Sequence, residues 1–70
     1  MKRTLIDVEP DSPGWKIRVG VCLLERNLEK VVAIERASRL AMERHRATGQ
    51  PTGVAIHTLH GGATLVGLHD

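Results

Sequence analysis

Hydrophobic and polar residues alternate along a segment that begins at the only tryptophan of the chain. The apolar side chains of this segment stand at every second position, at Trp15, Ile17, Val19, Val21 and Leu23. A period of two is that of a β-strand with one buried face. A looser alternation over residues 4–9 predicts an earlier strand, and the prolines and glycine of residues 10–14 predict a turn between the two. A short third strand near residues 23–25 is left open.

The period changes to a helical one after Asn27. Apolar residues then recur at spacings of three and four, at Val31, Ala33, Ile34, Ala37, Leu40 and Ala41. This spacing places them on one side of an α-helix. Asn27 is the predicted N-cap, and Gly49 followed by Pro51 predicts the end of the helix. We therefore predict an amphipathic helix over about residues 28–48.

The last segment of the chain predicts a β-hairpin. Two apolar runs, residues 54–59 and 63–68, flank Gly61 and Gly62. The turn centres either on Gly61-Gly62 or on His60-Gly61, and both alternatives leave the same side chains on each face of the hairpin. Both faces are apolar, and a single helix covers only one of them.

These elements predict an α+β fold in a single domain over residues 1–70. We expect a small antiparallel sheet of ββαββ-like order with the amphipathic helix packed on it. Of the 70 residues 41% are hydrophobic and 26% are charged, which is typical of a globular chain. One aromatic residue and one cysteine leave a small core without an internal disulfide. Chains of this size often gain stability from a second subunit, so a homodimer is expected.

The hairpin face that the helix leaves uncovered is the predicted dimer contact. On the predicted register this face carries His57, Leu59, Val66 and Leu68. A two-fold axis would set the same apolar patch against itself and remove it from water. Protonating a partly buried imidazole is unfavourable without a carboxylate partner, so we expect protonation of His57 to weaken the dimer between about pH 7 and 5.

Three stretches of the chain resemble a known bacterial family. They are the strand led by Trp15, the helical run Ala33-Ile34-Glu35-Arg36-Ala37-Ser38-Arg39-Leu40-Ala41, and Ile56-His57 followed by Gly61. A Trp-led strand, an A-I-x-x-A-x-x-L-A helix and an I-H…G hairpin are also the features of the small domain of unknown function 2188. The resemblance covers about residues 14–67. It implies an α+β fold and assigns no activity.

The candidate chemistry of the chain is sparse. Four histidines and one cysteine include no HxH or CxxC spacing. The three-residue spacing of His57 and His60 puts them on opposite faces of an extended segment unless the turn intervenes. The sequence places no base and orienting group beside Cys22, as a nucleophile requires. We therefore expect no metal, no cofactor and no enzymatic activity. The chain is interpreted as a protein-interaction module that acts as a homodimer.

A nucleic-acid-binding or regulatory protein is the alternative interpretation. Basic residues of the second strand and the helix are candidates for contacts with phosphates, at Lys16, Arg18, Arg36, Arg39 and Arg46. Glutamates interrupt the helical series, the formal net charge is only +2, and Trp15 is the one aromatic residue for stacking on bases. No apolar run reaches the length of a membrane span or of a signal peptide, so we expect no membrane contact and a cytoplasmic protein.

Trp15 carries the largest apolar side chain of the predicted core, at the head of the buried strand face. Replacing a buried tryptophan by alanine costs about 3–5 kcal/mol, which is comparable to the whole stability of a small domain. Trp15→Ala is therefore expected to unfold the protein, and thermal melting followed by circular dichroism measures this. A variant that melts within a few degrees of the wild type would place Trp15 on the surface.

Overall fold

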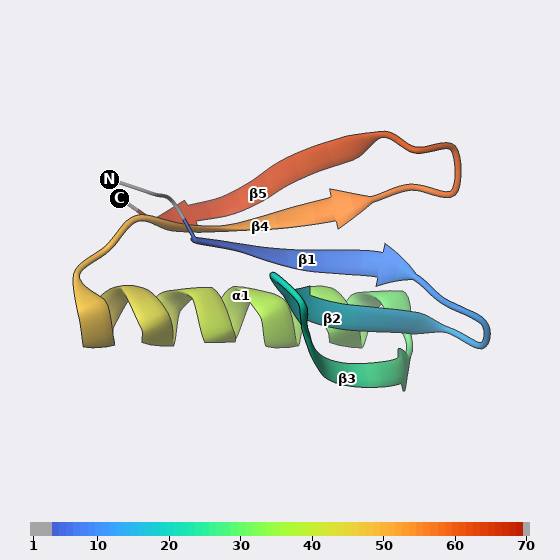
Figure 1. Ribbon diagram of the computed structural model, residues 1–70, viewed down its shortest axis with the longest axis horizontal. Coiled ribbons are helices and arrows are strands. Elements are labelled where there is room, and N and C mark those ends of the chain that lie inside the picture. Colours follow the sequence, from blue (N-terminus) through green and yellow to red (C-terminus); the bar gives the residue numbers. More distant parts are fainter. Residues whose placement is uncertain (1–3, 70) are drawn as a thin grey trace.

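One sheet and one helix make up the fold. The computed structural model of the chain describes the backbone of residues 4–69 and the side chains of residues 4–66. Its elements are β1 (Thr4–Pro10), β2 (Trp15–Val19), β3 (Cys22–Leu28), α1 (Lys30–Thr48), β4 (Thr52–His57) and β5 (Ala63–His69). The strands form a sheet in the order β3-β2-β1-β4-β5, and α1 lies across one face of it (Figure 1). The predicted α+β class is confirmed.

The sheet is mixed, because β1 and β4 run parallel while the other neighbouring strands run antiparallel. The prediction of an antiparallel sheet is wrong at this pair. β1 and β3 run in the same direction, since both are antiparallel to β2. α1 then carries the chain back along the sheet, and β4 begins beside the start of β1, where the N–H of Thr4 donates to the carbonyl of Pro51 at 3.0 Å. The 19 residues of α1 are long enough to connect two parallel strands.

The strand that begins at Trp15 is shorter than the alternation predicts. Gly20 has a φ of +59°, and the exposed fraction of Val21 is 98%, so the two residues form a tight turn. Glycine tolerates this left-handed conformation, which suits a short hairpin loop. The chain then returns as β3, a full strand where the sequence left only a short one open. The order of elements is therefore βββαββ rather than ββαββ.

The helix ends as predicted but begins later. Asn27 belongs to β3 with a φ of +59° and does not cap α1; Glu29 occupies the N-cap position without a side-chain hydrogen bond. At the other end Gly49 adopts a left-handed conformation, and its N–H donates to the carbonyl of His45 at 2.8 Å. Within residues 4–69, no helix combines the length and the hydropathy that crossing a membrane requires.

The core lies between α1 and the three central strands. Its fully buried apolar side chains are Ile6, Val8, Ile17, Ala33, Ala37, Ala41 and Val54. The helix contributes only alanines, four residues apart, and these small side chains let its backbone lie close to the sheet. Trp15 is partly buried against this core, as predicted, and Lys30 Nζ lies 5.2 Å from the centre of its ring.

The loop between β4 and β5 sets which hairpin residues face the core. Thr58 donates its N–H to the carbonyl of Gly62 at 2.8 Å, and Gly61 donates to the carbonyl of Thr58 at 3.2 Å with a φ of +86°. These bonds close a three-residue loop in which glycine takes the left-handed position. The predicted turn has two central residues. One extra loop residue slips the register by one and moves every side chain of β5 to the other face.

The predicted dimer face is therefore wrong. Val54 pairs with Val66, and Val66 packs against the core under the helix, whereas His57 lies on the opposite face of the sheet. Leu59 is at the loop tip, with an exposed fraction of 82%. The side chain of Leu68 lies outside the described residues.

The alanine contact between α1 and the sheet is testable by overpacking. Ala37→Leu adds three carbon atoms where the side chain is fully buried, and we expect it to lower the free energy of unfolding by about 1–3 kcal/mol. Glu35→Leu places the same side chain on the exposed side of the same helix and should change stability by less than about 0.5 kcal/mol. Urea unfolding measures both, and equal stability of the two variants would contradict close packing at Ala37.

Candidate functional site

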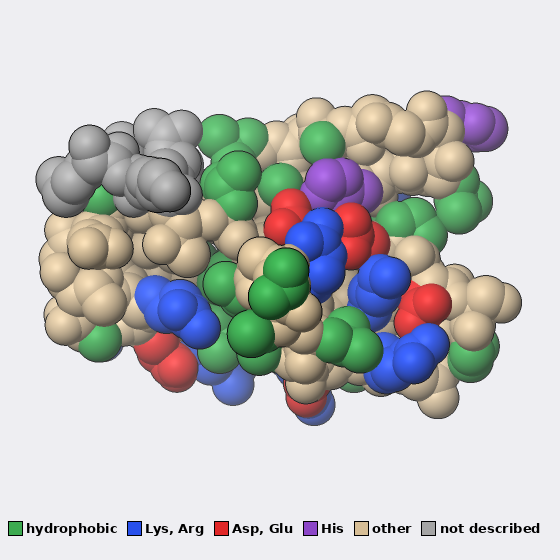
Figure 2. Space-filling model, in the orientation of Figure 1, with side chains coloured by type: hydrophobic (Ala, Val, Ile, Leu, Met, Phe, Trp, Pro, Cys, Tyr) green, Lys and Arg blue, Asp and Glu red, His purple; other side chains and the backbone are tan. Residues whose placement is uncertain are grey.

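The face of the sheet opposite α1 is the candidate functional site, and we call it the open face. It carries the strand residues that alternate with the core residues, namely Leu5, Asp7, Glu9, Lys16, Arg18, Leu23, Ala55, His57, Ala63 and Leu65. Acidic, basic and histidine side chains gather near its centre, with hydrophobic side chains to either side (Figure 2). The open face thus has a charged centre and apolar flanks.

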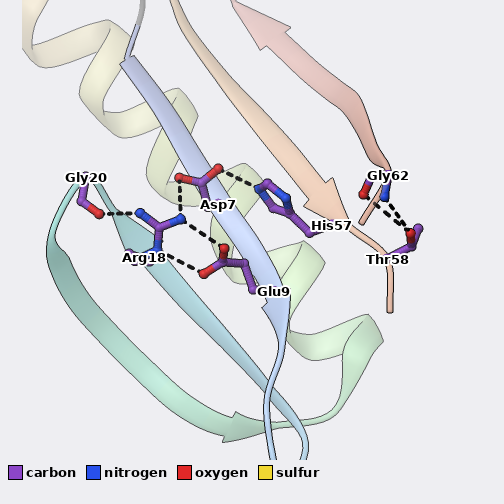
Figure 3. A network of polar contacts seen from close by, with 7 residues as sticks. All are labelled: Asp7, Glu9, Arg18, Gly20, His57, Thr58 and Gly62. Atoms are coloured by element: carbon purple, nitrogen blue, oxygen red, sulfur yellow. Dashed lines mark hydrogen bonds and ion pairs between the residues drawn. The ribbon is translucent and has the colours of Figure 1, made fainter. Parts of the chain in front are cut away.

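Arg18 is the hub of the charged centre. Its Nε and Nη2 each lie 2.9 Å from an oxygen of Glu9, which makes a two-point ion pair, and Nη2 lies 3.6 Å from Asp7 Oδ2 (Figure 3). Nη1 donates to the carbonyl of Gly20 in the turn before β3. The antiparallel register places Arg18 directly opposite Asp7, so the pairing of β1 with β2 builds this contact.

His57 joins the same network from β4. Its Nε2 lies 2.8 Å from Asp7 Oδ1, and both side chains are mostly shielded from water (Figure 3). This carboxylate partner removes the reason given for a dimer that weakens as His57 is protonated, so that expectation is withdrawn. The two residues are 50 positions apart and meet only because β1 and β4 pair side by side.

Hydrogen bonding and charge favour the ionised forms of Glu9 and Asp11. The hydrogen bond from Arg18 lowers the pKa of Glu9 below its ordinary value of 4.5, and the positive charge of Arg18 adds to the effect. The same contact raises the pKa of Arg18. At the turn after β1, the backbone N–H of Ser12 lowers the pKa of Asp11, helped by Arg26 at 3.0 Å. The charged side chains of the open face therefore neutralise one another.

Two arrangements considered from the sequence are not formed among the described residues. Cys22 and His57 lie on strands that β2 and β1 separate, so they do not form a nucleophile and base pair. Within the described part of the chain, no three side chains of His, Cys, Asp or Glu converge on a common point that would hold a metal ion.

The basic residues predicted as nucleic-acid contacts do not share one surface. Lys16 and Arg18 lie on the open face, whereas the other three, Arg36, Arg39 and Arg46, are exposed on α1 in the opposite layer. Arg18 is paired with Glu9, and Arg36 is paired with Glu25 of β3. The structure therefore divides the five between two layers, with Lys16 and Arg18 on the sheet and the other three on the helix.

A hollow lies between α1 and the edge strand β3. It has a volume of about 490 Å³ and is lined by Leu24, Glu25, Arg36, Arg39, Leu40 and Glu43. The ion pair between Glu25 and Arg36 joins its two walls. Its lining mixes both signs of charge with two leucines, so it presents no dominant chemistry.

The hydrophobic side of the open face lies over β1, β4 and β5. We call its residues Leu5, Ala55 and Leu65 the apolar flank. Leu5 and Leu65 are exposed by 39% and 45%. The buried Ala55 pairs with Leu65, while Leu5 pairs with Gly53, two residues earlier on β4. The sequence did not indicate Leu65 as an interface candidate, because the predicted hairpin register placed it on the other face. Opposite charges on facing strands, Asp7 and Glu9 against Lys16 and Arg18, were a signal that could have located the charged centre.

The geometry defines this protein as a small α+β protein with a mixed sheet that is open on one face. Comparison with protein-family models, with curated proteins and with solved structures finds no match to the chain. The resemblance to the domain of unknown function 2188 therefore stays a prediction.

The ion pair of Arg18 predicts a pH-dependent loss of stability. Arg18→Met keeps the apolar stem and removes the guanidinium, and it should lower the free energy of unfolding at pH 7 by at most about 1 kcal/mol. The folded state lowers the pKa of Glu9, so its contribution is present above pH 4.5 and is lost as the pH falls further. The difference in the free energy of unfolding between wild type and Arg18→Met should therefore disappear at acidic pH.

Urea unfolding at a series of pH values between 7 and about 3 measures this gap. Arg26→Met is the matched control, because it breaks the more exposed pair with Asp11 and leaves the network of Arg18 intact. At neutral pH, Arg26→Met should lower the free energy of unfolding by less than Arg18→Met does. A gap between Arg18→Met and wild type that stays constant down to the lowest pH would show that Glu9 gains nothing from Arg18.

Proposed function

We propose that this protein is a non-enzymatic protein-interaction module that acts as a homodimer. The observation that carries the proposal is the apolar flank, where no described part of the chain covers Leu5 and Leu65. Exposed apolar side chains grouped on a sheet face are typical of a surface that binds another protein. The contact between copies is assigned to this flank rather than to the face predicted from the sequence.

A second copy of the chain is the occupant that the charges favour. Beside the apolar flank stand two acids, Asp7 and Glu9, and two bases, Lys16 and Arg18, so this part of the open face has no formal charge when His57 is neutral. A surface with balanced charge meets its own copy without repulsion between like charges. A strongly acidic or basic partner would gain little from it.

The modest core also favours a second subunit. The largest fully buried side chains are Ile6 and Ile17, and three of the seven core residues are alanines. A chain of 70 residues buries only about 60% of its unfolded surface, so added burial against a partner matters to its stability.

The non-enzymatic part of the proposal rests on how the polar groups are used. Arg18, Glu9 and Asp7 satisfy one another, and His57 is directed at Asp7 rather than at a nucleophile. We place the protein in the cytoplasm, because its only cysteine, Cys22, is free and exposed, which suits a reducing compartment.

Sedimentation equilibrium at micromolar concentration tests the homodimer. We expect twice the mass of the chain at pH 7, and the same mass at about 0.5 M salt, because an apolar contact is not screened. Dissociation with added salt would assign the contact to charges instead of the apolar flank. A monomer under both conditions would overturn the proposal.

A further inference from the structure

The two edges of the sheet differ in how they are protected. The register between β3 and β2 shifts twice, and Asn27 of β3 has a φ of +59°. Glu25 and Arg26 place charges along this strand and pair with Arg36 and Asp11. Bulges and charges are the usual means by which an edge strand avoids pairing with another chain. The β3 edge is therefore protected against pairing with a strand of another chain.

The β5 edge carries fewer of these devices. Its register with β4 is regular from Ala63 to Val66 and shifts once beyond Val66, before His69 pairs with Thr52. The sequence of residues 63–69, ATLVGLH, contains no proline, lysine, arginine, aspartate or glutamate. The regular, uncharged stretch from Ala63 to Val66 is open to pairing with a further strand.

The hairpin bonds show which groups of β5 face outward. Thr58 donates its N–H to the carbonyl of Gly62, so these residues form a hydrogen-bonded pair of the ladder. Such pairs alternate along antiparallel strands, which makes Thr64 and Val66 the next residues bonded to β4. The N–H and C=O of Leu65 then point away from β4, toward the free edge.

We propose that two copies of the chain join by antiparallel pairing of their β5 strands about a two-fold axis beside Leu65. This rests on the proposed homodimer and places its contact at the β5 edge, so that Leu65 of the apolar flank lies in the contact while Leu5 stays on the open face of each copy. The two Leu65 residues then stand opposite each other and exchange both backbone hydrogen bonds, while Thr64 of each copy faces Val66 of the other. The two sheets become one continuous sheet with both helices on the same side.

The pairing also joins the apolar flanks of the two copies. Leu65 and its partner Ala55 continue across the axis into the same two positions of the second copy, and Leu5 lies one pair of residues further along β1 in each copy. No like charges stand opposite each other, because residues 63–69 carry no acidic or basic side chain apart from His69. The β3 edges, with their charges and bulges, become the two outer ends.

A matched pair of substitutions tests the surface. Leu65→Lys sets two ammonium groups opposite each other at the axis, and we expect the dimer dissociation constant to rise at least tenfold. Leu23→Lys is the control, because Leu23 has a similar exposed fraction, 48% against 45%, on the other edge strand of the open face. It should leave the dissociation constant unchanged. Circular dichroism confirms that both variants are folded.

Cross-linking provides a second measurement that does not depend on weakening the dimer. In a Cys22→Ser background, Leu65→Cys places two thiols across the axis with Cα atoms about 5.5 Å apart, which is within disulfide reach. Mild oxidation should give a covalent dimer, whereas Leu23→Cys in the same background should not.

The outcomes separate this inference from the homodimer itself. A wild-type monomer overturns the homodimer and the edge pairing together. A wild-type dimer that keeps its affinity in Leu65→Lys and forms no cross-link through Leu65→Cys overturns the edge pairing alone. Loss of the dimer in Leu23→Lys would move the contact to the β3 side.

Discussion

The parallel pairing of β1 with β4 is the contact on which the rest of this structure depends. It joins the first three strands to the last hairpin, and α1 packs against both parts. On the helix face it sets Ile6 beside Val54 beneath the alanines of α1. On the open face it brings Asp7 within hydrogen-bond distance of His57. A single strand pairing therefore builds the core on one side and the charged centre on the other.

The open face divides its polar and apolar side chains between different strands. Charged side chains of β1 and β2 satisfy one another around Arg18, which fixes their positions and leaves the region electrically balanced. Leu5 and Leu65 of the apolar flank are exposed, and Leu65 lies on the β5 edge, whose residues 63–68 include no acidic or basic residue. The opposite edge strand, β3, carries two register shifts and the charged residues Glu25 and Arg26.

Much of the fold follows from local patterns in the sequence. The helix is predicted by apolar spacing and ends at Gly49, because a left-handed glycine followed by Pro51 stops a helix whatever surrounds it. The strand at Trp15 and the burial of its apolar side follow from a period of two. The charged centre was also within reach, since Asp7 and Arg18 lie on the polar sides of two strands that a turn connects.

Tertiary structure decided the pairing partners and the faces of the last hairpin. Residue order does not say that β4 will lie beside β1, because strands far apart in the chain are chosen by how the helix returns across the sheet. The hairpin shows the same dependence on a smaller scale. A loop of three residues instead of two turned Val66 toward the core and Leu65 toward solvent. Local propensity barely distinguishes the two loops. Side chains alternate strictly between the two faces of a strand, so the choice of loop decides whether Val66 or Leu65 faces α1. Packing against α1 selects the loop that buries Val66.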